Sequence, residues 1–339
     1  MAASATEASN ATTEKVPGAP VDQPLREVGA LFRGTQFSET VWHNGGLDGV
    51  IVVDKSEGWT SHDVVARTRR IAKTKKVGHL GTLDPIATGV LPLVIGRATR
   101  LARFYTRSDK IYEGVVRFGW STDTYDRAGE ATSAKVEVTL DREALEAALQ
   151  EFRGEILQTP PAVSAKKVAG RRAYELARAA VAVELEPVKV QIYELTVMDV
   201  SGADARLRVE CSGGTYMRSI AHDLGKRMGC GAHLNELRRM ASGEFEIAQA
   251  KTLEQLDMLA AEERLEEALV PAARMLPEFP NVIVDETTAA RIREGRNFAA
   301  SPFRAGGPSR HVKAVTRAGE LVAIGEAVLP NLYHPVVVV

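Results

Sequence analysis

Alternating apolar and polar positions predict strands along the middle of the chain. Residues 49–54 form a short apolar run typical of a buried strand, and the alternation over 111–118 predicts another. This second strand places Tyr112, Val116 and Phe118 on one side. Two more alternating stretches, 188–192 and 205–211, predict further strands. Together they indicate a sheet with at least one face turned to the core.

Apolar residues spaced three and four apart predict helices between these strands. A helix is expected to begin at Thr60 or Ser61 and to end near Lys73. Another is expected behind a cap at Asp141, and a third follows two glycines with its apolar stripe over 217–228. The Leu- and Ala-rich stretch 253–269 is also expected to be helical. Strands and helices mix without strict βαβ alternation, so the predicted fold class is α+β.

The segment 78–89, GHLGTLDPIATG, is predicted to be a loop throughout, because three glycines and a proline disfavour regular structure. Its one acidic residue is Asp84. An aspartate before proline in such a segment is either a turn initiator or a reactive carboxylate, and the local pattern alone favours the turn initiator.

Composition along the chain predicts three parts. Residues 1–45 are expected to be a flexible extension, because the first 24 hold 14 of Ala, Ser, Thr or Pro and no apolar periodicity. Residues 46–275 are expected to form the main domain, with an irregular, basic insertion at about 154–187. Prolines at 271, 277 and 280 mark a boundary before a small β-rich module at 276–339, with a hairpin turn at 318–320.

The overall composition is that of an ordinary globular protein. The 339 residues are 45% hydrophobic, and 43 basic side chains nearly balance 44 acidic ones, which excludes a disordered chain. No apolar run approaches the ~18 residues of a membrane span, and no signal-peptide pattern opens the chain, so a cytoplasmic location without membrane contact is expected. Two cysteines without a CxxC pair suit a reducing compartment and argue against structural zinc.

Positive charge is concentrated within the neutral total. The window from Val64 to Arg107 contains ten basic residues and one acid, a net charge of +9, and two smaller basic clusters lie at 166–178 and 218–239. These clusters either form one phosphate-binding face or are separate solvated surfaces. Charge alone leaves both interpretations open.

The GHLGTLDPIATG segment resembles the signature of the TruB-type tRNA pseudouridine-55 synthases. The resemblance runs from Val50 to about Arg239, through KIYEGVVRFG, STDTYD, QTPPAVSAKK, CSGGTYMRSIAHDLG and CGAHLNELRR in the family's order. Ser56 departs from it, because the family usually has proline after the lysine. The resemblance implies a mixed, mainly antiparallel sheet core of the pseudouridine synthase type, and the tail resembles an RNA-binding PUA-like domain more weakly.

The resemblance also implies a reaction and the residues that catalyse it. Pseudouridine formation cuts the bond between ribose C1′ and uracil N1 and rejoins the base through C5, so it needs a nucleophile but no metal or cofactor. A carboxylate can serve as that nucleophile, and nearby cations favour its charged form. The implied catalytic residues are Asp84 as nucleophile, Arg218 as its ion-pair partner and Tyr112 as the aromatic that stacks on the flipped base.

Each catalytic assignment has a plainer alternative. Tyr112 fits a core aromatic that shares a face with its strand neighbours, and Arg218 fits a phosphate-binding or surface arginine. Arg218 lies in the first turn of its helix, off the apolar stripe, where a cation is electrostatically unfavourable; this supports a specific carboxylate partner.

Further residues match the family's binding positions. The implied substrate-binding residues are His79, Lys55, Asp126, Tyr216 and Leu237. The basic insertion would bind the RNA backbone through Lys166, Lys167, Arg171 and Arg172. The partner implied is tRNA, at its T-stem and loop, with no obligate protein partner and a monomeric chain. The alternatives are a guide-dependent ribonucleoprotein synthase and a non-catalytic RNA-binding or RNA-folding protein.

Overall fold

The computed structural model describes residues 46–161, 167–168, 171–172, 185–300 and 309–339. The predicted extension at 1–45, Lys166 and most of the predicted insertion lie outside these residues. Two short strands of the insertion, β6 (Lys167–Val168) and β7 (Arg171–Arg172), are described by their backbone pairing alone.

Ten of the described strands form one sheet. In chain order they are β1 (Gly49–Lys55), β2 (Val77–His79), β3 (Ala87–Ile95), β4 (Lys110–Phe118), β5 (Gly154–Gln158), β8 (Val188–Ser201), β9 (Asp204–Cys211), β10 (Ala232–Ser242), β11 (Phe245–Glu246) and β12 (Leu269–Pro271).

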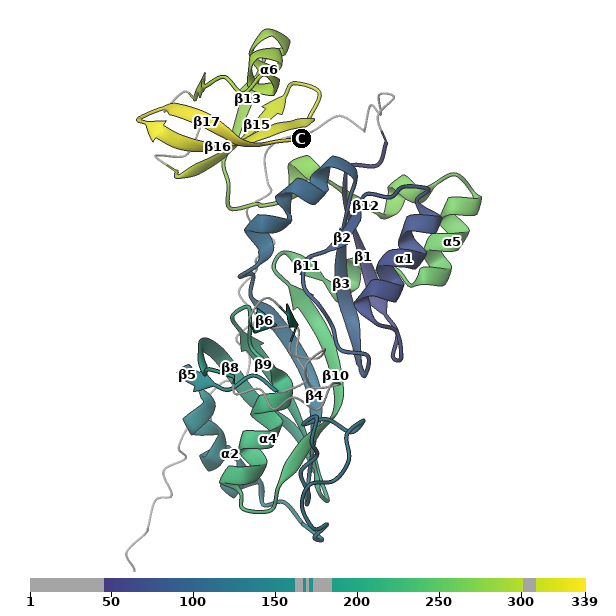
Figure 1. Cartoon of the computed structure of the whole chain (residues 1–339), viewed down its shortest axis with the longest axis vertical. Helices are drawn as coiled ribbons and strands as arrows, with labels where there is room; N and C mark the ends of the chain where they lie inside the picture. The colour runs from purple at the N-terminus through teal and green to yellow at the C-terminus, as the bar shows by residue number, and fades with distance from the viewer. Residues whose placement is uncertain (1–45, 162–166, 169–170, 173–184, 301–308) are drawn as a thin grey trace, which may run out of the picture. The chain divides into compact units, whose positions relative to one another are not determined.

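The order across the sheet is β12-β1-β3-β10-β4-β9-β8-β5, with β2 added to β3 and β11 to β10 (Figure 1). The pair of β3 with β10 is parallel, whereas the other ladders of this sheet are antiparallel. The predicted α+β class and the mixed, mainly antiparallel sheet are therefore confirmed. The parallel pair brings the end of the GHLGTLDPIATG segment, residues 87–89 of β3, against β10.

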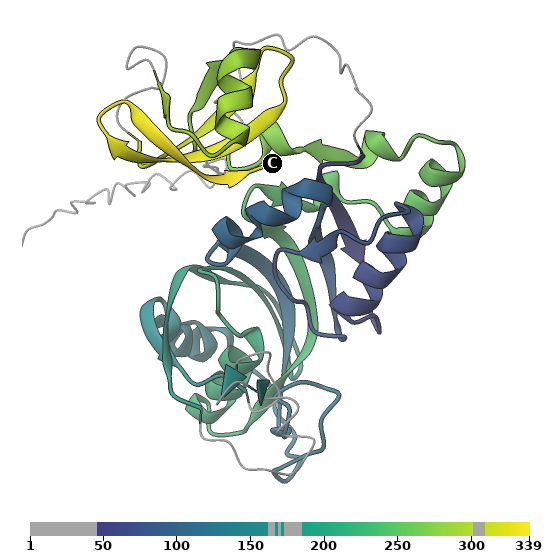
Figure 2. The ribbon, with the colours of Figure 1, turned by 45° about the horizontal axis from the view of Figure 1, so that its top comes forward.

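Both faces of the first strands are covered. On β1, Ile51 and Val53 belong to one apolar cluster and Val50 and Val52 to another, as the period of two requires. Helices α1 (Ser61–Ile71) and α5 (Leu253–Ala261) pack side by side next to β1 and β2, and α2 (Arg142–Leu149) and α4 (Met217–Arg227) lie together on the sheet farther along (Figure 2). Within the described residues, no helix is both long and apolar enough to cross a membrane.

The start of α1 is set by a capping box. The Thr60 hydroxyl accepts a hydrogen bond from Asp63 N at 3.1 Å, and the Asp63 carboxylate accepts one from Thr60 N at 3.0 Å. Thr60, not Ser61, is therefore the N-cap. The Ser61 hydroxyl instead forms hydrogen bonds with the backbone of Leu83.

Three local predictions are wrong. The 78–89 segment is not a loop throughout, because Gly78 and Gly89 take part in strand ladders and only the stretch 80–86 is irregular. The predicted insertion begins with β5, which pairs with β8 in the main sheet. The helix expected over 253–269 is interrupted: α5 ends at Ala261, Glu263 adopts φ +58°, and a separate 3₁₀ turn follows.

The C-terminal residues form a second, five-stranded sheet with its own apolar cluster. Its strands are β13 (Asn281–Val284), β14 (Phe298–Ala299), β15 (His311–Thr316), β16 (Leu321–Leu329) and β17 (Leu332–Val338), and its helix is α6 (Glu286–Arg293). Gly319, at φ +85°, lies in the turn between β15 and β16, so the predicted hairpin turn at 318–320 is confirmed.

Gly89 allows the close approach of β3 to β10. Its φ is +96°, and a Cβ atom at this position would lie 2.3 Å from the carbonyl oxygen of Arg239. Only glycine fits both the backbone conformation and the space.

We expect Gly89→Ala to lower the free energy of unfolding by roughly 3 kcal/mol, since it adds backbone strain to overpacking. Gly202→Ala is the matched control, because Gly202 has φ +59° but no atom within 4 Å of the added Cβ. It should cost only about 1 kcal/mol. Urea denaturation of the three proteins measures both values, and equal losses would contradict the proposed clash.

Candidate active site

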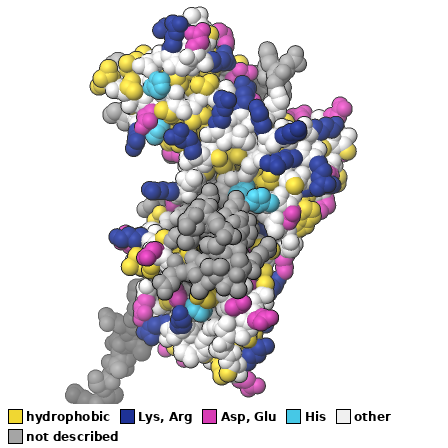
Figure 3. All heavy atoms as spheres, in the orientation of Figure 1, with side chains coloured by type: hydrophobic (Ala, Val, Ile, Leu, Met, Phe, Trp, Pro, Cys, Tyr) yellow, Lys and Arg dark blue, Asp and Glu magenta, His cyan; other side chains and the backbone are white. Residues whose placement is uncertain are grey.

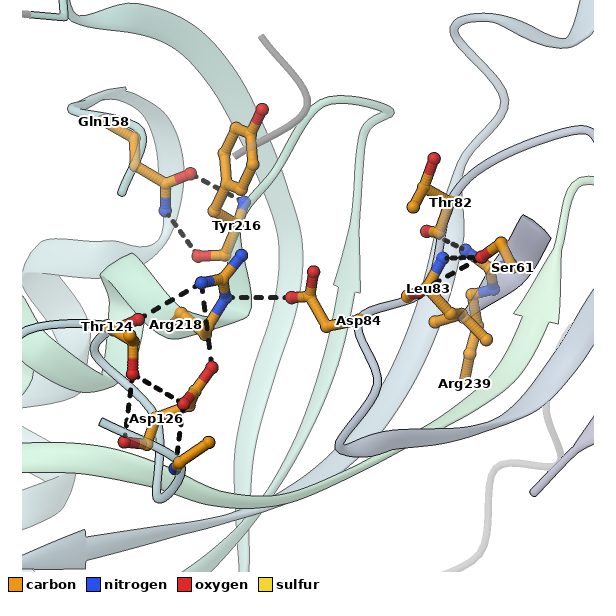
Figure 4. A network of polar contacts seen from close by, with 11 residues as sticks. Ser61, Thr82, Leu83, Asp84, Thr124, Asp126, Gln158, Tyr216, Arg218 and Arg239 are labelled. Atoms are coloured by element: carbon orange, nitrogen blue, oxygen red, sulfur yellow. Dashed lines mark hydrogen bonds and ion pairs between the residues drawn. The ribbon is translucent and has the colours of Figure 1, made fainter. Parts of the chain in front are cut away.

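Asp84 lies in the irregular stretch 80–86, between β2 and β3. Its Oδ2 atom is 2.8 Å from Arg218 Nε (Figure 4). The two side chains differ in exposure: 37% of the Asp84 side chain is accessible to solvent, against 5% for Arg218. The pair therefore joins a buried cation to a carboxylate that a bound molecule can reach.

A second carboxylate helps to hold Arg218. Arg218 Nη1 lies 3.7 Å from Asp126 Oδ2 and donates a hydrogen bond to Thr124 O at 3.2 Å. Asp126 is itself oriented, because its Oδ1 accepts hydrogen bonds from the Thr124 hydroxyl at 2.7 Å and from Ala128 N at 3.0 Å. Two negative charges thus offset a guanidinium in the first turn of α4, where the helix dipole disfavours a cation.

Gln158 fixes the beginning of α4. Its side-chain oxygen accepts a hydrogen bond from Tyr216 N at 2.7 Å, and its amide nitrogen donates to Tyr216 O at 3.1 Å. Ser219 Oγ donates to Thr159 O at 2.8 Å. The end of β5 therefore determines where α4 begins, and with it the place of Arg218.

The backbone around Asp84 is held from one side by Ser61 and Lys55. Ser61 Oγ accepts a hydrogen bond from Leu83 N at 2.9 Å and donates to Leu83 O at 3.1 Å. Lys55 is fully buried, and its ammonium group donates to Trp59 O at 2.7 Å, to Ser56 O at 3.0 Å and to Pro85 O at 3.4 Å. These bonds fix the residues on either side of Asp84.

The positive charge near the site is buried at a cost. Burial lowers the pKa of Lys55 to about 8, although the Asp84 carboxylate opposes this shift. Burial and the charge of Arg239 likewise lower the pKa of Lys110 to about 8. Lys55 and Arg218 thus both place a positive charge close to the Asp84 carboxylate.

Tyr112 lies on β4 and is 8% exposed. Burial raises the pKa of its phenol, while the charge and hydrogen bond of Arg239 oppose the rise. The phenol therefore remains protonated near neutral pH. Its strand partner on β10 is Arg239, and Leu237, two residues earlier on β10, is buried in the main core between β3 and β4.

His79 ends β2 at the edge of the Asp84 loop. Its Nδ1 accepts a hydrogen bond from Gly81 N at 3.3 Å, and its ring meets that of His62 edge-on with centroids 5.9 Å apart. Of the four predicted backbone-binding residues, Lys166 lies outside the described chain, and the other three are placed only through the β6–β7 pairing of Lys167 with Arg172 and of Val168 with Arg171.

Four residues that hold the site in place were not predicted from the sequence: Ser61, Thr124, Gln158 and Arg239. Arg239 was grouped with a basic cluster that was expected at the surface, either on a phosphate-binding face or on a separate solvated one, but it is 1% exposed. The Arg239 guanidinium is therefore not available to a phosphate group. In the structure Leu237, Arg239 and Ala241 share the buried side of β10.

Comparisons with known families agree with this arrangement. Residues 69–217 match the model of the TruB family pseudouridylate synthase N-terminal domain, and residues 218–277 match the tRNA pseudouridylate synthase B C-terminal domain. The tRNA pseudouridine synthase B of Solibacter usitatus (strain Ellin6076) is 74% identical over 292 residues, which cover 86% of this chain and 100% of that protein. The corresponding protein of Aquifex aeolicus (strain VF5) is 42% identical over 254 residues, covering 74% and 87%.

Solved structures with a similar fold come from ribonucleoprotein particles. A chain of the archaeal box H/ACA sRNP Nop10-Cbf5 complex is 28% identical, with a TM-score of 0.63 over 84% of this chain and 80% of that one. A chain of an H/ACA RNP bound to a substrate RNA containing 2′-deoxyuridine is 26% identical, with a TM-score of 0.64 over 89% and 92%.

The matched family models and relatives define the class as that of the pseudouridine synthases, which are isomerases. Relatives above 40% identity are matched over most of their length. The chain belongs to the TruB family.

The shifted pKa of Lys55 predicts a pH dependence of stability. The ordinary lysine value is 10.5 and the folded value is about 8, so between these pH values the unfolded chain binds more protons. The Lys55 contribution to the free energy of unfolding therefore rises with pH across this window. Relative to Lys55→Met, the wild type should gain stability from pH 8 to pH 10 in urea denaturation.

The other lysines with lowered pKa, Lys110 and Lys313, are present in both proteins and cancel in the comparison. Lys75→Met, which removes an exposed lysine, provides the baseline. The assigned burial of the ammonium would be contradicted if the free energy of unfolding of the wild type, minus that of Lys55→Met, stayed constant or fell with rising pH.

Proposed function

We propose that this chain converts uridine to pseudouridine at position 55, in the T-loop of tRNA, as a monomer without a cofactor or an obligate protein partner. The observation that carries the proposal is the 2.8 Å ion pair between the reachable Asp84 carboxylate and the buried Arg218 guanidinium. The names of the relatives, each a tRNA pseudouridine synthase B, support tRNA as the substrate.

Asp84 is the proposed nucleophile. During the reaction the bond from C1′ to N1 breaks, a bond from C1′ to C5 forms, and the proton on C5 is lost while N1 gains one, so atoms and electrons balance without an oxidant. A carboxylate that attacks either C1′ or the uracil ring carries one fragment through this exchange. Arg218 orients that carboxylate through the ion pair.

Tyr112 and the residues around it would hold the target base. A uridine in a folded RNA loop has to leave its stack, which costs a few kcal/mol, and an aromatic face replaces part of the lost stacking. We place Tyr112 against the flipped base and assign substrate-binding roles to His79 and Tyr216 at the edges of the site. Lys55, Asp126 and Leu237 would act from beneath, since all three are buried.

The RNA backbone would be bound by surface cations outside the catalytic pair. Arginine and lysine side chains gather over α1 and the 3₁₀ helix Gly96–Tyr105 (Figure 3). Exposed members of this group are Arg69, Arg70, Arg97, Arg100 and Arg103. We further propose that residues 46–275 form the catalytic domain, that the insertion clamps the loop with Lys166, Lys167, Arg171 and Arg172, and that the PUA-like module at 276–339 extends contact along the stem.

A guide-dependent synthase is the second candidate, because the solved structures of similar fold come from H/ACA particles. The 74% identity to a tRNA pseudouridine synthase B, against 28% to a particle chain, favours the stand-alone enzyme. A tRNA-modifying enzyme of this kind would work in the cytoplasm.

Asp84→Asn should abolish turnover while tRNA binding persists, because the amide is a poor nucleophile and the phosphate contacts lie elsewhere. The measurement is tritium release from C5-labelled uridine in an unmodified tRNA transcript, with purified protein and no other component. Filter binding of the same transcript measures affinity.

Wild-type release from the bare transcript would support a stand-alone enzyme, whereas no release without added RNA or protein would favour the guide-dependent candidate. Release by Asp84→Asn at the wild-type rate would remove Asp84 from the mechanism. Loss of binding together with turnover would make Asp84 structural.

A further inference from the structure

Arg239 is a buried arginine at the centre of the main sheet. It lies on β10, between β3 and β4, and is 1% exposed. Its strand partners are Gly89 on β3 and Tyr112 on β4. It therefore lies directly between the strand that follows the Asp84 loop and the strand that carries the tyrosine.

The guanidinium group of Arg239 binds three backbone carbonyl groups. Nε donates to Val90 O at 2.7 Å, Nη2 to Gly81 O at 3.1 Å and Nη1 to Thr82 O at 3.3 Å. Two of these carbonyls belong to the Asp84 loop, three and two residues before the aspartate, and Figure 4 shows Arg239 beside Thr82 and Leu83. The third anchors the same side chain to β3.

Burying this charge is unfavourable for stability. A desolvated guanidinium that binds neutral carbonyls is costly, and Arg239 also lowers the pKa of Lys55 and of Lys110, both buried nearby. An apolar residue at this core position would avoid both costs. The arrangement therefore indicates a functional requirement at this site.

We propose that Arg239 is a positioning residue, which sets the place of the Asp84 loop relative to Tyr112 and so aligns the carboxylate with the stacked base. This inference rests on the proposed function. Ser61 and Lys55 hold the backbone at Leu83 and Pro85. Arg239 adds support earlier in the loop, at residues 81 and 82, and ties this part of the loop to β3.

Arginine is suited to this role by its shape. Its planar fork carries five N–H donors in fixed directions, so one side chain can bind carbonyls on two separate segments at once. Lysine has the same charge but presents its donors from a single nitrogen. Arg239→Lys should therefore retain the charge and lose the geometry.

The test compares kcat, KM and melting temperature for Arg239→Met, Arg239→Lys and the control Arg117→Met. Arg117 lies on the adjacent strand β4 and is ion-paired with Asp204, so its loss also removes an arginine from the sheet. We expect kcat to fall about 10²-fold for Arg239→Met, as a misplacement near 1 Å can produce. Arg239→Lys should lose at least about tenfold of kcat, since the charge remains but the fork is gone.

The KM for tRNA should stay within about threefold of wild type in both Arg239 variants, because the phosphate contacts lie elsewhere. The control should keep kcat within about twofold. A merely structural role would lower the melting temperature and leave kcat per folded molecule unchanged, and that result would overturn the proposal. A loss confined to KM would also overturn it.

If Arg239→Met does not fold, Arg239→Lys decides: a folded variant with the kcat of the control contradicts the inference. Failure of the proposed function is recognised separately, because the wild type itself would then form no pseudouridine, and the inference would fall with it.

Discussion

The whole site depends on the burial of one cation, the Arg218 guanidinium. In the first turn of α4 and 5% exposed, it needs counter-charges, because an uncompensated buried charge is strongly destabilising. Asp84 and Asp126 supply them from two loops that are distant in sequence. One electrostatic requirement thus draws the 80–86 stretch, the turn around Asp126 and the start of α4 together. The carboxylate that is left partly exposed, Asp84, is the one that a bound molecule can reach.

The rest of the fold limits the movement of that carboxylate. Ser61 and Lys55 hold the chain at Leu83 and Pro85, and Arg239 holds it at residues 81 and 82. The parallel approach of β3 to β10 requires glycine at position 89. Burying several cations around one loop lowers the stability of the fold, but it fixes the position of that loop. This is the expected pattern where a reactive group has to be held close to its target.

The sequence indicated the candidate site residues better than it indicated the residues that hold them in place. The strand with Tyr112, the helix with Arg218 and the α+β class follow from periodicity, and the family resemblance selects Asp84 from a stretch that otherwise reads as a turn. The tertiary partners were not predictable in this way: the Ser61 hydroxyl reaches across 22 residues, and Gln158 fixes a helix 58 residues away. Arg239 was counted in a basic surface cluster, because charge in the sequence does not distinguish a buried arginine from an exposed one. Local sequence patterns indicate which face of a helix or strand is buried. They do not indicate which residue, distant in the sequence, contacts that face.

The most direct test of the central claim is the single-turnover rate of pseudouridine formation by Arg218→Met, measured with saturating protein on an unmodified tRNA transcript. The account predicts a folded protein that still binds tRNA but reacts at least about 10²-fold more slowly, since the carboxylate loses the cation that orients it. A folded Arg218→Met that forms pseudouridine at the wild-type rate would show that the ion pair does not prepare Asp84 for reaction, and would contradict the account.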